Sequence, residues 1–205
     1  MVAPPEWIAR QESRLVRAAW EYAARAHAGQ TRKDNPAIPF LVHPESVAEI
    51  LSQEGYPDAV VAAALLHDVV EDTQTTLADI EEQFGIEIAA LVAAVTEPPK
   101  DALAWEARKD AYLEQLKEAP LNAVAIAVAD KIHNLTSLRA AYLREGEALW
   151  EKFSRPLSQS WEFYERFAAL ARARLGAEHP LARTLEARLR ELGEVVGEEI
   201  PSRED

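Results

Sequence analysis

Cysteine is absent from this chain of 205 residues, and methionine occurs once. The absence of cysteine excludes disulfide-stabilised scaffolds and thiolate metal sites, so any metal ion must be bound by nitrogen and oxygen atoms. No run of roughly eighteen apolar residues occurs, and the first residues lack the basic flank and apolar stretch of a signal peptide. We therefore expect a soluble cytoplasmic protein without membrane association.

Positive charge is also scarce, because 22 Lys and Arg residues stand against 35 Asp and Glu residues and give a formal net charge of −13. Non-specific affinity for nucleic acid comes from neutralising phosphates with Lys and Arg, so nucleic acid is not an expected partner. A small anionic ligand remains compatible with this charge, since a metal ion or a local group of cations can reverse the field at one site.

Alternating patterns typical of β-strands are missing, whereas apolar residues recur at helical spacing along most of the chain. Helices are predicted over about residues 13–27, 43–54, 57–72, 76–85, 86–95, 104–117 and 122–142, with two more between 147 and 192. The helix over 76–85 begins with Thr76-Leu77-Ala78-Asp79, which resembles a capping box, and Gly85 is expected to end it. No repeat or low-complexity linker divides the sequence. We predict an all-α fold, a single-domain helical bundle over residues 1–205, with an acidic tail at 198–205 that is frayed.

The stretch from Val61 to Asp72 is apolar until it reaches four polar residues at its end. His67 and Asp68 are adjacent, and Glu71 and Asp72 follow them at a spacing of four, which places the side chains on roughly one helix face. Burying three carboxylates and an imidazole is costly unless a cation compensates them. A divalent metal ion is therefore the first hypothesis.

A second apolar helix, over about 122–142, turns polar at Asp130 and Asn134. If both helices are buried side by side, these polar groups must meet one another or a ligand. A metal ion bound by His67, Asp68 and Asp130 satisfies them with mixed nitrogen and oxygen donors. His43 is the best placed residue to complete a four-ligand set, although a role at its helix start suits it equally well.

The other charged and imidazole side chains have ordinary explanations. His27 and His133 are interpreted as structural residues or as partners of the ligands, and His179 as a solvent-exposed loop residue. Arg32 and Lys33 lie in a loop rich in proline and turn-forming residues, where such a pair is usually solvated. They gain a function only if that loop folds over the metal ion.

Four spaced motifs resemble the HD-type hydrolase domain of the RelA/SpoT family. They are Gly29-Gln30-x-Arg32-Lys33, Pro39-Phe40-x-x-His43-Pro44, Ala63-Ala64-Leu65-Leu66-His67-Asp68-x-x-Glu71-Asp72-Thr73 and Ala129-Asp130-Lys131-x-His133-Asn134-Leu135. In order and spacing they are most similar to the stand-alone small alarmone hydrolases, the group that contains the metazoan SpoT homologue. The resemblance covers about residues 20–138.

The resemblance implies an all-helical HD fold and one Mn²⁺ ion. It implies hydrolysis that removes the 3′-pyrophosphate of guanosine tetra- or pentaphosphate (ppGpp or pppGpp), giving GDP or GTP and pyrophosphate. The residues that match the family's motifs are His43, His67, Asp68 and Asp130 as metal ligands, Glu71 and Asp72 as the catalytic acidic pair, and Arg32, Lys33, Asn134 and Ser137 as substrate-binding residues. A chain of this length has no room for a synthetase domain, so hydrolase activity alone is expected.

The sequence departs from the family pattern at a few positions. Phe40 replaces a common tyrosine, and Trp105 falls where a substrate-side lysine is frequent, with Arg108 and Lys109 close by. Phe163 or Tyr164 is a candidate to close over the base, and both also suit the core. Two alternatives stay open: an HD-type enzyme for another nucleotide, such as ppApp, NADPH or a nucleoside monophosphate, and a catalytically silent module that binds a nucleotide or a partner.

Overall fold

The computed structural model describes residues 3–33, 35–99, 101–153 and 157–197, and within these ranges the chain is helical or irregular apart from one isolated β-bridge between Thr31 and Pro39. The elements are α1 (Glu6–Ala9), α2 (Arg14–Ala26), α3 (Val42–Gln53), α4 (Asp58–Leu66), α5 (Val69–Asp72), α6 (Leu77–Phe84), α7 (Ile86–Val95), α8 (Trp105–Glu118), α9 (Leu121–Glu145), the 3₁₀ helix η1 (Gly146–Lys152), α10 (Leu157–Leu175) and α11 (Pro180–Val196). The predicted all-α fold is confirmed. Among these helices, none is long and apolar enough to cross a membrane.

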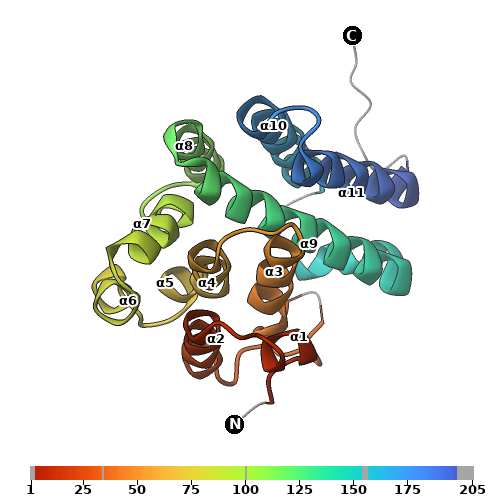
Figure 1. Cartoon of the computed structure of the whole chain (residues 1–205). Coiled ribbons are helices and arrows are strands. Elements are labelled where there is room, and N and C mark those ends of the chain that lie inside the picture. Colours follow the sequence, from red (N-terminus) through yellow and green to blue (C-terminus); the bar gives the residue numbers. More distant parts are fainter. Residues whose placement is uncertain (1–2, 34, 100, 154–156, 198–205) are drawn as a thin grey trace.

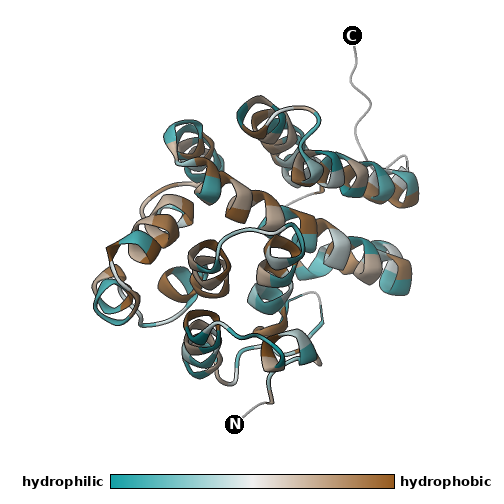
Figure 2. Ribbon diagram, in the orientation of Figure 1, coloured by the Kyte–Doolittle hydropathy of each residue, from teal (hydrophilic) through white to brown (hydrophobic). Residues whose placement is uncertain are grey.

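Helix α9 occupies the centre of the molecule. It packs against α3, α4 and α7 on one side and against α10 and α11 on the other (Figure 1). Each residue from Ala123 to Ile132 is buried, as expected for a helix that is apolar all round. Figure 2 shows hydrophobic and hydrophilic residues alternating along the outer helices. Asp130 and Lys131 are held within the core, and His133 and Asn134, which follow them, are half-buried.

The predicted continuous helix over 57–72 is interrupted. Helix α4 ends at Leu66, His67 and Asp68 form a turn, and α5 begins at Val69. The reason lies in the His67 ring, whose Nδ1 is 2.7 Å from the carbonyl oxygen of Ala64. In a continuous helix that carbonyl would accept the backbone N–H of Asp68, and a side chain that takes it competes with the helix.

Several helix boundaries follow the sequence signals. Thr76 and Asp79 form the predicted capping box at the start of α6, and Gly85 ends that helix with a positive φ of 87°. The C-terminal region differs from prediction, since residues from 146 onward first form η1 before α10 begins at Leu157. His179, expected to be solvent-exposed, is half-buried: its Nδ1 accepts the Leu181 N–H at the start of α11, and its Nε2 lies 3.4 Å from the Tyr56 hydroxyl. The tail predicted to be frayed, 198–205, lies outside the described residues.

Arg174, near the end of α10, joins that helix to the corner between α8 and α9. Its guanidinium donates hydrogen bonds to the carbonyl oxygens of Leu116, Lys117 and Ala119. These carbonyls lie at the end of α8, where a helix leaves its last acceptors unpaired. One side chain therefore satisfies several of them and fixes α10 beside α8.

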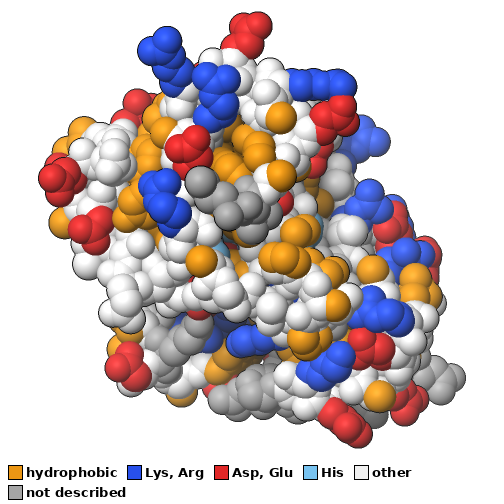
Figure 3. Space-filling view, turned by 90° about the horizontal axis from the view of Figure 1, so that it is seen from below, with side chains coloured by type: hydrophobic (Ala, Val, Ile, Leu, Met, Phe, Trp, Pro, Cys, Tyr) orange, Lys and Arg blue, Asp and Glu red, His pale blue; other side chains and the backbone are white. Residues whose placement is uncertain are grey.

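Charged side chains on the surface are mixed in sign. On the face seen from below, Lys and Arg lie between Asp, Glu and exposed hydrophobic side chains (Figure 3). This face therefore carries no continuous basic surface.

Candidate metal centre

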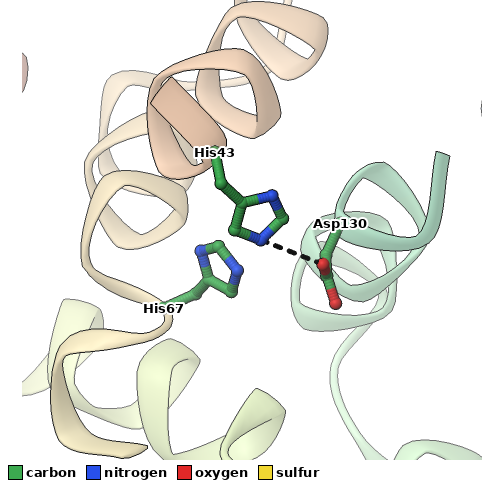
Figure 4. A group of neighbouring side chains, drawn as sticks. All are labelled: His43, His67 and Asp130. Carbon is green, nitrogen blue, oxygen red and sulfur yellow. Dashed lines mark ion pairs between the residues drawn. The ribbon is translucent and has the colours of Figure 1, made fainter. Parts of the chain in front are cut away.

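Four polar side chains from three parts of the chain meet beneath a pocket. His43 lies in the first turn of α3, His67 and Asp68 form the turn after α4, and Asp130 lies in α9. Figure 4 shows His43, His67 and Asp130 pointing toward one another. His43 Nε2 is 3.2 Å from Asp130 Oδ1 and 3.3 Å from Asp68 Oδ2. Candidate ligand atoms of His43, His67 and Asp130 all lie within 4.8 Å of one another. The structure thus brings the four predicted ligands together.

The orientation of the His67 ring fits a cation bound at its Nε2. Its Nδ1 must carry the proton, because the Ala64 carbonyl it faces can only accept. Its Nε2 is therefore the nitrogen that can bind a cation, and it is buried without a hydrogen-bond partner. This nitrogen faces Asp68 Oδ1 at 3.3 Å. Either a proton or a metal ion must lie between a ring nitrogen and a carboxylate oxygen at this distance, since otherwise the two repel each other.

His43 is oriented from behind by His133 of α9, whose Nδ1 is 2.7 Å from His43 Nδ1. If Nε2 of His43 is the ligand atom, the proton of the His43 ring is on Nδ1, and this N–H donates a hydrogen bond to His133 Nδ1. Burial, and then the neighbouring His43 and Arg32, lower the pKa of His133 to about 3, so this ring is neutral and able to accept. Its other nitrogen lies 3.5 Å from Ser137 Oγ. His133 therefore fixes the tautomer of a candidate ligand.

The carboxylates remain ionised in this interior. Burial raises the pKa of Asp130, but Lys131 and His43 outweigh it and hold the pKa well below its ordinary value. The pKa of Asp68 is likewise lowered, since His67 and His43 outweigh its burial. Two imidazole nitrogens and ionised carboxylate oxygens are a donor set suited to a divalent metal ion. The residues present therefore fit such an ion.

A pocket of about 770 Å³ opens over this group. Its charged lining consists of the cations Arg32, Lys33, Arg108, Lys109 and Lys131 and the carboxylates Asp68, Glu71, Asp72, Glu97 and Asp130. The formal charges of five cations and five carboxylates cancel, in a protein whose net charge is −13. A divalent ion would make the pocket positive, which favours an anionic ligand.

The predicted acidic pair lies at the edge of the metal centre, where both residues line the pocket. Glu71 Oε1 accepts the backbone N–H of Glu97 at 2.8 Å. Burial and the nearby Asp68 carboxylate raise the pKa of Glu71 to about 8. The backbone carbonyl of Asp72 accepts a hydrogen bond from Gln30, which ties α5 to the loop after α2.

The predicted substrate-binding residues also line the pocket, on the side of that loop. Arg32 donates to Asn134 Oδ1 at 3.3 Å, and the Asn134 amide in turn donates to Asp130 Oδ1. Lys33 is exposed at the rim, and Ser137 lies one turn beyond His133. Arg32 is therefore connected to a candidate ligand through a single amide.

Sequence reasoning missed two interactions. It did not foresee that Glu97 holds Glu71, nor that Lys131 forms a buried ion pair with Asp130 at 2.6 Å. The sequence does contain a signal for the ion pair between Lys131 and Asp130, because a lysine buried in an apolar helix needs a partner of opposite charge, and an aspartate directly precedes it. Both candidates for the base, Phe163 and Tyr164, line the pocket, and Phe163 is buried.

The fold is that of a known family. The HD domain family model matches residues 19–159, and the chain belongs to this family. Human guanosine-3′,5′-bis(diphosphate) 3′-pyrophosphohydrolase MESH1 is 42% identical over 130 residues, which cover 62% of this chain and 71% of MESH1. The bifunctional (p)ppGpp synthase/hydrolase SpoT of Escherichia coli K12 is 31% identical over 193 residues, which cover 91% of this chain and 25% of SpoT.

Solved structures agree with this assignment. A metazoan ortholog of SpoT, described as hydrolysing ppGpp, aligns with a TM-score of 0.72 and 29% identity over 91% of this chain and 98% of its own. A protein from Listeria monocytogenes EGD-e aligns with a TM-score of 0.65 and 36% identity over 75% of this chain and 98% of its own. The resemblance to RelA/SpoT-type HD hydrolases inferred from the motifs is confirmed.

Proposed function

We propose that this protein hydrolyses guanosine 3′,5′-bis(diphosphate) and its pentaphosphate form, releasing pyrophosphate from the 3′ position. The observation that carries the proposal is the group of His43, His67 and Asp130 beneath the pocket, in a chain related to hydrolases of that name. In the reaction, a water oxygen bonds to phosphorus, the bond from phosphorus to the 3′ oxygen breaks, and that oxygen receives a proton. GDP or GTP and pyrophosphate result.

His43, His67, Asp68 and Asp130 would hold one divalent ion, for which we propose Mn²⁺. Such an ion polarises a phosphoryl oxygen and lowers the pKa of water when bound. Mn²⁺ accepts imidazole together with carboxylate and water, which matches these donors. His133 and the Ala64 carbonyl keep the two imidazoles in the tautomers that leave Nε2 available.

Glu71 and Asp72 would position the attacking water and accept its proton. A general base works best when its pKa is close to the operating pH, and the pKa of Glu71 is raised to about 8 in the metal-free site. A nearby divalent cation lowers that value, because it favours the charged carboxylate. The Glu97 N–H holds one oxygen of Glu71 and directs the side chain into the pocket.

Arg32 and Lys33 would bind the nucleotide, with Asn134 and Ser137 along the ribose and phosphates. The planar guanidinium of Arg32 can stack on a purine, whereas the Lys33 ammonium is a point charge suited to phosphate. The Arg32 guanidinium carbon lies 6.0 Å from the centre of the Phe40 ring, and both residues line the pocket. The two flat groups therefore lie close together in the pocket wall. Phe163 and Tyr164 are available on the opposite wall.

The two alternatives differ in what they require of the site. A catalytically silent module would not need its candidate metal ligands close together. His43 Nε2 and Asp130 Oδ1 are 3.2 Å apart, and this proximity argues against such a module. An enzyme for another nucleotide needs the same metal centre with different contacts. Trp105 in the pocket wall, where relatives commonly have a lysine, is the position at which such a preference would arise.

A substrate panel tests the proposal. Purified protein is freed of metal, loaded with Mn²⁺, Mg²⁺ or Zn²⁺, and offered ppGpp, pppGpp, ppApp, NADPH and nucleoside monophosphates. We expect pyrophosphate release from ppGpp and pppGpp with Mn²⁺. Absence of pyrophosphate from both guanosine substrates under all three metals would overturn the proposal.

Two substitutions separate the ligand role from the acidic-pair role. Asp68→Ala is expected to lose both the bound ion and activity, measured by metal analysis and turnover. Glu71→Ala is expected to keep the ion and lose about 10²- to 10⁴-fold in turnover. Normal turnover by Glu71→Ala would show that the acidic-pair assignment is wrong.

A further inference from the structure

Lys131 is a buried cation directly beside a candidate ligand. Only 7% of the residue is exposed, and its ammonium lies 2.6 Å from Asp130 Oδ2. Aromatic rings surround it, with centres 5.3 Å away for Tyr112, 5.8 Å for Phe167 and 5.9 Å for Phe163. The ammonium is therefore enclosed between the Asp130 carboxylate and three aromatic rings.

The two oxygens of Asp130 have separate partners. Oδ1 faces His43 Nε2 at 3.2 Å and accepts the Asn134 amide, so it points toward the other candidate ligands. Oδ2 is taken by the ammonium of Lys131. A carboxylate can bind a cation through one oxygen or through both, and the second mode uses an additional coordination position. Both oxygens accept a hydrogen bond, but only Oδ2 carries a full positive charge against it, and the Lys131 ammonium opposes a second cation at that oxygen. Oδ1 is therefore the oxygen that remains available to a metal ion.

We propose that Lys131 is a positioning residue that restricts Asp130 to a single metal-binding oxygen and thereby keeps a coordination position open for water or substrate. This inference rests on the metal centre of the proposed function. The rings around the ammonium come from two helices, with Tyr112 in α8 and Phe163 and Phe167 in α10. A cation over aromatic faces is held electrostatically, so these rings keep the Lys131 ammonium beside Oδ2. Helices α8 and α10 thus act on the metal centre without supplying a ligand.

A competing role for Lys131 is direct binding of a substrate phosphate, since the residue also lines the pocket. The two roles predict different changes when the ammonium is removed. A phosphate-binding lysine would affect substrate affinity and leave the metal ion's own water unchanged. A positioning lysine affects that water before any substrate is present.

The experiment measures water on bound Mn²⁺ in the absence of substrate. Wild type, Lys131→Met and Lys131→Arg are stripped of metal and titrated with Mn²⁺, and the relaxation rate of water protons gives both the affinity and the number of exchangeable waters. We expect Lys131→Met to bind Mn²⁺ at least as tightly as wild type, with about one water fewer because Oδ2 also binds. Its kcat on ppGpp should fall about 100-fold with little change in KM.

The controls separate this role from simple packing. Lys131→Arg retains a donor for Oδ2 and should restore the wild-type water number. Lys109→Met removes another pocket lysine, 4.8 Å from the Phe163 ring, whose carboxylate partner Glu97 is not a ligand, so the water number should not change. Lys131→Leu provides a second variant without a donor if the methionine variant does not fold by circular dichroism.

The outcomes are distinct. An unchanged water number in the folded donor-free variants would overturn the inference, and a higher KM with that number unchanged would assign Lys131 to phosphate binding instead. Failure of wild type to bind Mn²⁺ would count against the proposed function itself and would be seen before any variant is compared.

Discussion

Glu71 is a half-buried carboxyl on which catalysis and the surrounding protein make opposite demands. Catalysis needs it to give and take a proton, whereas its surroundings favour the protonated form in the metal-free state. Burial and Asp68 raise its pKa from 4.5 to about 8, and the Glu97 N–H only partly offsets them. Between pH 4.5 and about pH 8, Glu71 is therefore protonated in the folded protein and ionised in the unfolded chain.

This difference predicts a pH dependence of stability. From pH 4.5 to about 8, the folded state holds more protons at Glu71, so the free energy of unfolding falls as the pH rises. Glu71→Gln removes this contribution. Urea unfolding with EDTA should show the variant gaining stability relative to wild type between about pH 5 and about pH 8. Parallel curves for the two proteins would contradict the raised pKa.

His133 gives a second prediction at this scale. The ring fixes His43 with Nε2 toward the other ligands, and partners of metal-bound histidines typically account for about 10- to 100-fold in metal affinity. His133→Leu should therefore weaken Mn²⁺ binding by about that factor in a calorimetric titration. Ser137→Ala, which removes only the more distant contact at 3.5 Å, should have a smaller effect. Equal losses in the two variants would show that His133 does not orient His43.

The sequence predicted which residues belong to the candidate site better than it predicted their contacts. His67 and Asp68 could be identified because buried polar side chains at the end of an apolar run need a cation to compensate them. The contact between His43 and His133 could not be predicted, because it joins residues 90 positions apart and depends on how α3 packs against α9. The pairing of Glu71 with the Glu97 backbone has the same origin in tertiary packing.

Among the elements, the end of α8 depends most clearly on a remote side chain. Arg174 donates to three of its last carbonyls, and hydrogen bonds to charged groups contribute about 1.5–3 kcal/mol. We expect Arg174→Ala to lower the free energy of unfolding by about 2 kcal/mol in urea titrations.

Arg172 on the same helix is the matched control, because its side chain is 62% exposed and its nearest carboxylate, on Glu186, is 3.8 Å away. Exposed pairs of this kind contribute about 0–1 kcal/mol, so Arg172→Ala should leave stability nearly unchanged. A similar loss in both variants would indicate that helix α10 loses stability generally, without a specific role for the Arg174 contacts.

Element boundaries were predictable where local chemistry decides them. The capping box of α6 involves Thr76 and Asp79 alone, and it forms as predicted. The break after Leu66 was missed because it arises from a side-chain hydrogen bond of His67 that competes with the helix. Local apolar periodicity contains no signal for that competition.

For the molecule as a whole, the metal ion should act as a structural link as well as a cofactor. Its candidate ligands come from α3, the turn before α5, and α9, which are far apart in sequence. A ligand present at 100 times its Kd stabilises the folded state by about 2.7 kcal/mol, which for a chain of this size raises Tm by roughly 5–10 °C.

Differential scanning fluorimetry with Mn²⁺ against EDTA measures this shift. Asp68→Ala should show little or none of it, because that variant lacks one ligand, whereas Glu71→Gln should retain it. A shift of equal size in Asp68→Ala would mean that the ion stabilises the protein from another location.

Helix α9 imposes a limit on how the chain length can vary. Asp130, Lys131, His133, Asn134 and Ser137 all lie within one stretch of this helix. Inserting one residue just before Asp130 would rotate all five by about 100° and shift them by about 1.5 Å relative to the preceding turns. No compensating change in one partner could restore five contacts at once. We therefore expect insertions and deletions in related chains at surface connections such as 176–179, and none between the start of α9 and Ser137.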